Sequence, residues 1–155
     1  MAFLSSINII GSGLTAQQLR LDVVSENITN STTTRTENDG GAYRRKMVVF
    51  EAQSGREDFR SAMAKAAGKA VANRDNGANA GGVRVTQIMD DPSPLKLVYD
   101  PTHLDANEEG YVEMPNVDTV KEITDAMAAT QAYSANVTAF NTLKSVIAKG
   151  LEIGG

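Results

Sequence analysis

The sequence predicts an α+β protein in which two long terminal helices, packed as a coiled-coil-like stalk, flank a small and mostly β insert. Residues 1–19 and 126–143 carry no charged side chain, whereas strand-like runs and turn signals lie between them. A helix on a globular surface normally has a charged outer face. Uncharged helices rich in Ser, Thr, Asn, Gln and Ala therefore indicate contact on several sides, which a chain of 155 residues can obtain by assembling with other chains.

The N-terminal segment, residues 1–30, follows an apolar heptad pattern that is interrupted once, at Gln17. The pattern predicts a helix from about residue 4 to residue 28 whose seam packs against another helix. The seam consists of Phe3, Ile7, Ile10, Leu14, Leu21, Val24 and Ile28. Gly11 and Gly13 each cost about 1 kcal/mol relative to alanine in a helix interior, so we expect packing to hold this helix and both glycines to allow a close approach.

The middle of the chain, residues 31–115, predicts the β-rich insert. A stretch rich in Thr, Asn and Gly ends the first helix pattern. Residues 53–82 are rich in Ala, Gly, Asn and charge, so we expect a long flexible loop there, with at most a short helix near 59–72. Alternation and β-branched or aromatic residues predict four strands, over residues 43–52, 83–89, 95–99 and 111–114.

The C-terminal segment, residues 116–155, predicts a second long helix. Asn116 or Asp118 can cap its N-terminus, and Asp118 and Glu122 place negative charge where the helix dipole favours it. A helix of roughly 30 residues would be about 45 Å long and would project beyond the insert. Its apolar stripe consists of Val120, Ile123, Met127, Tyr133, Val137, Phe140, Ile147 and Leu151. The simplest arrangement pairs the two helices and leaves the insert at one end.

The composition excludes several classes of protein. The chain has no cysteine, which excludes disulfides and thiolate chemistry. Its net charge is −4, and residues 90–155 hold eleven acidic and four basic residues, so we expect no nucleic-acid partner. The N-terminus lacks the basic region and the continuous apolar run of a cleavable secretory signal, and it is too polar to span a membrane.

The side chains that could carry chemistry favour structural roles. His103, the only histidine, lies in an acidic loop with Asp100 and Asp105, where a solvated loop is a simpler interpretation than a metal site. The basic residues 44–46 alternate between the faces of a strand, which favours a subunit contact with the acidic C-terminal third. No nucleophile, base and orienting group occur together. We therefore expect no enzyme, no cofactor or metal and no small-molecule substrate.

Several strings in the first third of the chain resemble the bacterial flagellar basal-body rod protein family. The runs SGLTAQ (residues 12–17) and SENITN (residues 25–30) are similar to the family's N-terminal signature, and YRR (residues 43–45) matches its continuation. Thr29 stands where alanine is more common in the family. The motif positions are Ser12, Gly13, Leu14, Gln17, Asn27, Asn30, Tyr43, Arg44 and Arg45.

The second half is similar to the short proximal rod proteins of that family. The matching strings are DPSP, VYDP, GYV and MPNVD, all within residues 91–118, and YSAN at 133–136 also fits. Leu104 stands where proline is more common, and residues 53–82 carry no resemblance. The motif positions here are Asp91, Pro92, Tyr99, Asp100, Pro101, Gly110, Tyr111, Pro115 and Asn116.

The resemblance implies a structural subunit of the proximal rod, the tube that crosses the periplasm and transmits torque. Its partners would be further copies of itself, other rod subunits, the flagellar type III export apparatus and the basal-body membrane ring. Members of the family are exported unfolded without a cleavable signal, which would also account for the absence of cysteine. Their terminal segments pair as helices that line the tube, so the seam and the stripe become the expected assembly interface.

Composition and periodicity alone leave a second hypothesis open, a soluble helical adaptor or chaperone-like binding module. Such a bundle would be fully helical as a monomer and would melt cooperatively. A rod subunit would be largely non-helical as a monomer and would gain helix on polymerising. The resemblance within residues 90–118 favours the rod subunit.

Overall fold

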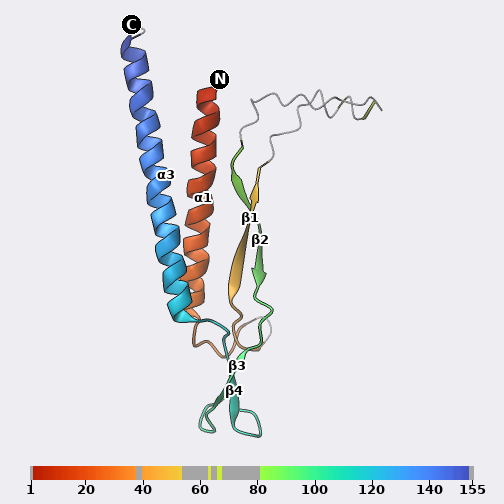
Figure 1. Ribbon diagram of the computed structural model, residues 1–155. Coiled ribbons are helices and arrows are strands. Elements are labelled where there is room, and N and C mark those ends of the chain that lie inside the picture. Colours follow the sequence, from red (N-terminus) through yellow and green to blue (C-terminus); the bar gives the residue numbers. More distant parts are fainter. Residues whose placement is uncertain (1, 38–39, 54–62, 64–65, 68–80, 154–155) are drawn as a thin grey trace.

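Two long antiparallel helices and two β-hairpins make up the computed structural model of the chain, which describes residues 2–37, 40–53, 63, 66–67 and 81–153 (Figure 1). Helix α1 spans Ala2–Thr29 and helix α3 spans Thr119–Ile153. One antiparallel hairpin pairs β1 (Lys46–Ala52) with β2 (Val83–Asp90). The other pairs β3 (Lys96–Tyr99) with β4 (Tyr111–Met114). The predicted fold class is confirmed.

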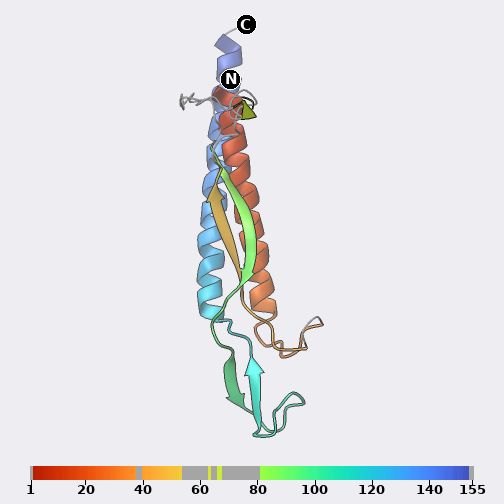
Figure 2. The ribbon, with the colours of Figure 1, turned by 90° about the vertical axis from the view of Figure 1, so that its right-hand side faces the viewer.

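Helix α1 is the central layer of the molecule. Figures 1 and 2 show α3 on one side of it and the β1–β2 hairpin on the other, and α1 contacts all three of these elements. The β3–β4 hairpin extends beyond the helices, at the end opposite the termini (Figure 1). We expected the whole insert at that end. The first hairpin lies along α1 instead, and both of its strands contact that helix.

Small residues hold the two helices together. Ala16 of α1 and Ala129 of α3 are buried, and a Cβ atom at Gly13 would lie 3.0 Å from Nδ2 of Asn136. The expected close approach is therefore confirmed at Gly13, whereas at Gly11 no such neighbour lies within 4 Å. The apolar core of the described residues is thin and contains no Leu, Ile, Met or Phe: its members are Ala16, Val23, Val24, Tyr43, Val112, Val117 and Ala129.

The antiparallel pairing brings the two uncharged segments side by side. Gly13 lies against Asn136, while Arg20, the first charged residue of α1, pairs with Asp125 at 2.6 Å. This ion pair marks a boundary, because beyond it both helices are uncharged toward the chain termini, as far as Leu143 in α3. We call residues 1–19 and 126–143 the uncharged half of the stalk; at 1.5 Å per residue it is about 27 Å long.

The strand boundaries follow the sequence pattern closely except at the start of β1. Strands β2, β3 and β4 begin and end within one residue of their predicted limits. Strand β1 begins three residues later than predicted, at Lys46, because the Tyr43 N–H donates to the Thr33 carbonyl and the Arg45 N–H donates to Asn116, and only the Arg45 carbonyl bonds to the residue that follows β2, Asp91. The register shifts between Val49 and Phe50, which pair with Gln87 and Val85, so β2 carries one extra residue there, as in a β-bulge.

Most of the predicted flexible loop at 53–82, and nearly all of the short helix near 59–72, lie outside the described residues. Among the residues that are described, neither long helix has a stretch sufficiently apolar to cross a membrane.

Candidate structural junction and assembly surface

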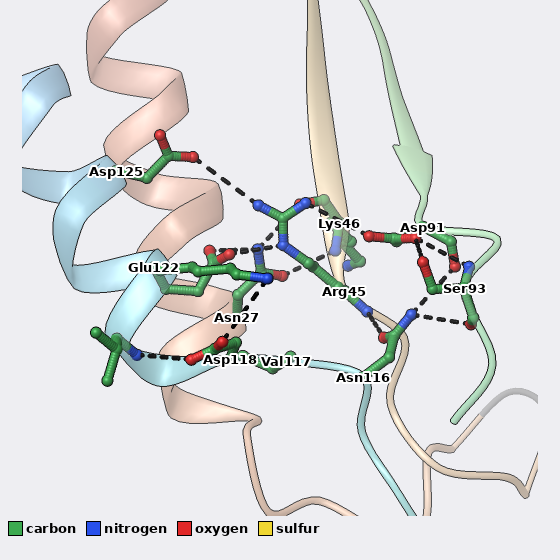
Figure 3. A network of polar contacts seen from close by, with 12 residues as sticks. Asn27, Arg45, Lys46, Asp91, Ser93, Asn116, Val117, Asp118, Glu122 and Asp125 are labelled. Atoms are coloured by element: carbon green, nitrogen blue, oxygen red, sulfur yellow. Dashed lines mark hydrogen bonds and ion pairs between the residues drawn. The ribbon is translucent and has the colours of Figure 1, made fainter. Parts of the chain in front are cut away.

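Glu122 is fully buried at the foot of the helix pair, where α3 begins (Figure 3). Its Oε1 accepts a 2.6 Å hydrogen bond from Nε of Arg45, and its Oε2 accepts a 2.9 Å hydrogen bond from Nδ2 of Asn27. A buried charge is tolerated when it is paired and hydrogen-bonded. Both oxygens of this carboxylate meet that condition, with one partner from α1 and one from the segment that enters β1.

Asn27, 1% exposed, connects α1 to the same segment. Its Oδ1 accepts hydrogen bonds from the Tyr43 hydroxyl and the Lys46 backbone N–H, each at 2.9 Å. Its Nδ2 donates to the Lys46 carbonyl at 2.9 Å and to Glu122. An amide side chain offers two donors and two acceptor lone pairs, so every hydrogen-bonding site of Asn27 is used.

Tyr43 is held as a neutral donor in this network. Burial raises the pKa of its hydroxyl, and the carboxylates of Glu26, Asp90 and Glu122 raise it further. The proton that Tyr43 donates to Asn27 therefore stays in place throughout the physiological pH range.

Arg45 is the cation at the centre of the network (Figure 3). Burial by itself lowers the pKa of its guanidinium, but the hydrogen bond to Glu122 and the negative charges of Glu122, Asp91 and Asp125 raise the pKa overall. The guanidinium lies 3.6 Å from Asp91 and 3.9 Å from Asp125. Its backbone N–H donates to Oδ1 of Asn116 at 2.8 Å. Arg45 thus joins α3 to the segments that follow β2 and β4.

Asn116 joins the two hairpins. Its Nδ2 donates to the carbonyls of Asp91 and Ser93, at 3.3 and 3.1 Å. Hydrogen bonds from the Ser93 hydroxyl and backbone N–H, together with the nearby Arg45 charge, hold the pKa of the Asp91 carboxyl below its usual value. Asn116 is therefore not the helix cap. Asp118 caps α3, because its Oδ1 accepts from the Val120 N–H at 3.1 Å.

We call Asn27, Tyr43, Arg45, Asp91, Asn116 and Glu122 the junction network. Five of the six belong to the family motif positions recognised in the sequence; Glu122 does not. The sequence suggested only a helix-dipole role for Glu122. One signal could have found it: Glu122 lies four residues before Ala126 and seven before Ala129, on the face of α3 that packs inward.

The basic residues 44–46 reach three different partners. Arg44 donates to the Ser93 carbonyl at 3.4 Å, Arg45 pairs with Glu122, and Lys46 pairs with Glu26. As the alternation of strand faces predicted, these three residues do not form one basic patch. Within the chain, Arg45 pairs with Glu122, Asp91 and Asp125 of the acidic C-terminal third, and the subunit contact suggested by the sequence stays a prediction.

Two further motif positions also hold the fold. Oγ of Ser12 accepts a hydrogen bond from the Val83 N–H at 3.1 Å, which attaches the start of β2 to α1. Asn30 closes the end of α1, because its Nδ2 donates to the Glu26 carbonyl and its Oδ1 accepts from the Thr33 hydroxyl.

The β3–β4 hairpin depends on a glycine in its connecting loop. Gly110 has a φ of +82°, and a Cβ atom there would lie 3.0 Å from the Tyr99 ring and 3.2 Å from Pro101. The Tyr99 and Tyr111 rings meet edge to face, 5.3 Å apart. Asp100 accepts hydrogen bonds from the Thr102 hydroxyl and N–H, which lower the pKa of its carboxyl.

We predict that Gly110→Ala destabilises this hairpin by about 1–3 kcal/mol, because left-handed backbone is strained for a residue with a Cβ atom. Asn107→Gly in the same loop is a different kind of change, since it removes the acceptor for the Tyr111 N–H and creates no steric clash. Hydrogen exchange of the amides of residues 96–114 would measure both. Equal protection in Gly110→Ala and the unmodified chain would contradict the prediction.

His103 lies in a loop that docks on the segment after α1. Its Nδ1 accepts a hydrogen bond from the Asp105 N–H at 3.1 Å. The Asp105 carboxylate accepts from the Thr34 hydroxyl at 2.9 Å and from Arg35 at 2.6 Å. Across the described parts of the chain, His, Asp and Glu side chains form no group of three or more that could hold a metal ion.

The apolar seam of α1 is only partly covered by the rest of the chain. Val24 is buried, and the side chain of Phe3 lies outside what the structure describes. Gln17, the polar interruption, is also half-buried, and its Oε1 has no hydrogen-bond partner in the structure. The other seam residues are all half-buried: Ile7, Ile10, Leu14, Leu21 and Ile28.

The stripe predicted on α3 does not form one face. Tyr133, Val137 and Ile147 are half-buried, and Phe140 is more exposed. Val120, Ile123 and Met127 are 73%, 48% and 69% exposed. Val120, Ile123 and Met127 therefore lie on a different side of α3 from Tyr133, Val137 and Ile147. At the start of α3 the inward face is formed by Glu122 and small residues, and the large apolar side chains point outward.

Models of two known families match the chain. The model for the flagellar basal body rod protein matches residues 7–35, and the model for the C-terminal part of the flagellar basal body rod FlgEFG proteins matches residues 108–153. These two segments contain most of α1 and all of α3.

Curated relatives match over nearly the whole chain. The flagellar basal-body rod protein FlgC of Bacillus subtilis (strain 168) is 46% identical over 157 residues, covering 99% of both chains. The FlgC proteins of Borreliella burgdorferi and Escherichia coli O6:H1 are 44% and 40% identical, and each match covers at least 98% of both chains.

A paired-helix stalk with these matches at both ends defines a structural subunit of the bacterial flagellar basal-body rod, and not an enzyme. The chain belongs to the FlgC family of rod proteins. The family decides between the two hypotheses that composition left open, in favour of the rod subunit over the adaptor.

Proposed function

We propose that this chain assembles with further copies of itself and with other rod subunits through the uncharged half of its stalk, and so forms part of the wall of the proximal rod in the periplasm. The observation that carries the proposal is the alignment of two uncharged helical segments at one level of the stalk, bounded by the Arg20–Asp125 ion pair. A helix surface without charge can be buried against another chain without the cost of desolvating ions.

The thin core supports the same proposal. Few apolar residues are buried in the described part of the chain, and most of them are Ala or Val. Many large apolar side chains remain exposed on both hairpins and on α3. Burial contributes about 25 cal/mol per Å² of apolar surface, so much of the available stabilisation is still unused in the single chain. Assembly would supply it. The junction network would then carry torque between the stalk and the hairpins, because it bonds all of them together.

The export route and the outer contacts of the proposal rest on the resemblance to the rod family. We expect the chain to pass unfolded through the flagellar type III export apparatus without a cleavable signal. The absence of cysteine is compatible with such a route, since no disulfide can form before the chain has crossed. A contact with the basal-body membrane ring is part of the same expectation.

We predict that Thr138→Asp prevents incorporation into the rod, whereas Ser145→Asp has a much smaller effect. The two residues lie seven apart on one face of α3, both are exposed, and both hydroxyls bond to the carbonyl four residues earlier. Only Thr138 lies in the uncharged half; Ser145 follows Lys144. Immunoblots of purified basal bodies and swimming assays would measure the outcome. Equal loss, or no loss, in both variants would contradict the proposal.

A second prediction concerns the isolated chain. Because its core is thin, the purified monomer at micromolar concentration should show little helix by circular dichroism and should gain helix as it polymerises. A fully helical monomer with a cooperative melt would show that the stalk is complete without partners, which is the behaviour expected of an adaptor.

A further inference from the structure

The β3–β4 hairpin has one covered face and one open face. Residues two apart on a strand share a face, and residues paired directly across two strands point to the same side. Val112 is 2% exposed, so the face that it shares with Val98 is partly covered by the rest of the chain. The opposite face presents Leu97, Tyr99 and Tyr111, which are 65%, 64% and 40% exposed. The described chain thus leaves an aromatic sheet face uncovered, and we call it the open face of the hairpin.

Hydrogen bonds hold the connecting loop of this hairpin in one shape. Oδ1 of Asn107 accepts from the backbone N–H groups of Glu109 and Tyr111, at 3.0 and 2.8 Å. Asp105 attaches the same loop to the segment that follows α1. Leu104, which is 92% exposed, projects from this fixed loop. A partner would therefore bind a surface that is already formed, and little conformational entropy would be lost on binding.

The hairpin also carries the whole net charge of the chain. Residues 96–114 hold five acidic residues and one basic residue, which is a net charge of −4 with His103 neutral. The chain as a whole holds 19 acidic and 15 basic residues, also −4, so 14 of each remain elsewhere. Glu113 lies on the open face, and Glu108 and Glu109 lie in the loop. All three side chains are exposed, and none bonds to another described residue.

We infer that the open face is the docking surface for a different protein, one that presents an apolar pocket bordered by Lys or Arg side chains. Tyrosine is enriched in the centre of protein interfaces, whereas charged residues are depleted there and belong to the rim. The open face has this arrangement, because Tyr111 lies between Glu109 and Glu113 along the chain. This inference does not rest on the proposed contact through the uncharged half of the stalk.

The described surface of a second copy offers no matching cluster of cations. Two hairpins of equal charge repel each other, and the rest of the chain has no net charge. Most Lys and Arg side chains that the structure describes already bond within the chain. The two that bond to no other described residue, Lys144 and Lys149, lie near the C-terminal end of α3, far from the hairpin (Figure 1). The opposite charge must therefore come from a different protein.

Photo-crosslinking in assembled basal bodies tests the inference. The photo-reactive residue benzoylphenylalanine would replace Leu97 in one strain and Leu104 in another, because both side chains are exposed. Swimming cells would be irradiated, and their purified basal bodies would be analysed by immunoblot and by mass spectrometry of the crosslinked peptides. We expect both positions to crosslink to a different protein, within a segment that contains Lys or Arg.

A charge reversal in the crosslinking chain tests the electrostatic part. Glu109→Lys should lower the crosslink yield per incorporated chain by about fivefold, the upper value for one exposed ion pair. The hairpin itself should still fold, since the Glu109 side chain bonds to no described residue. Glu152→Lys is the matched control, because it makes the same change in net charge at an exposed residue of α3 and should leave the yield unchanged.

Any of four results would overturn the inference. The first is a product of twice the 16.5 kDa chain mass that contains only this chain. The second is a crosslinked segment without Lys or Arg, and the third is an equal yield in Glu109→Lys and Glu152→Lys. The fourth is the absence of any product from both positions in strains that swim. None of these measurements changes the uncharged half of the stalk, so the Thr138→Asp experiment tests the proposed function separately.

Discussion

The Glu122→Ala variant should dissociate from isolated basal bodies on heating at a much lower temperature than the unmodified chain does. Removing the carboxylate takes away the 2.6 Å acceptor of the Arg45 Nε and one of the two acceptors of the buried Asn27 amide, and leaves Arg45 only the more distant carboxylates of Asp91 and Asp125. Breaking a buried ion pair in this way costs about 3–5 kcal/mol. The measurement is the amount of chain that remains with the basal bodies after heating.

Asp125→Asn is the matched control for that experiment. Asp125 also lies near Arg45, but at 3.9 Å, and its side chain is partly exposed in its 2.6 Å pair with Arg20. Exposed pairs contribute about 0–1 kcal/mol, so this variant should behave nearly like the unmodified chain. The double variant Glu122→Leu, Arg45→Met should recover part of the loss, because apolar residues often replace a buried pair at little cost. Equal release of Glu122→Ala and Asp125→Asn would show that the network does not hold the stalk.

Ala129→Asp should abolish incorporation into the rod while leaving export unchanged. Ala129 is a fully buried residue of α3. An added carboxylate has neither room nor a partner there, and burying an unpaired polar group costs about 2–7 kcal/mol even before the charge is counted. Secreted protein and protein recovered in basal bodies would be measured in parallel.

Ala148→Asp makes the same chemical change at an exposed residue of α3 that lies beyond the uncharged half of the stalk. It should be incorporated far better than Ala129→Asp. If both variants are secreted and neither is incorporated, the loss does not come from disrupted α1–α3 packing at Ala129. If Ala129→Asp is not secreted at all, the chain does not travel unfolded.

The sequence predicted the elements well because each one depends on local patterns. Heptad spacing located α1, alternation located the strands, and Asp118 and the absence of helix breakers located α3. Five of the family motif positions lie in the junction network. What they do could not be predicted, because the roles of Asn27, Arg45 and Asn116 are set by partners between 16 and 95 residues away.

The surface of α3 was harder to predict for a physical reason. Amphipathic reasoning assigns apolar residues to the inside and charged residues to the outside. In α3 the fully buried carboxylate belongs to Glu122, and Val120 and Met127 lie outside. Such an inversion is expected where the exposed side of the single chain is the inside of an assembly, and periodicity alone cannot distinguish the two sides.

The central position of α1 has a consequence for the order in which the chain can fold. The bonds that close the stalk join residues 95 and 105 positions apart, in the Asn27–Glu122 and Arg20–Asp125 pairs. Contacts between such distant residues form slowly and only when both ends are present. A chain that emerges from a channel one end first therefore cannot close its stalk in transit, whichever end leads. Topology alone delays folding until the last turns of α1 and the first turns of α3 have both left the channel.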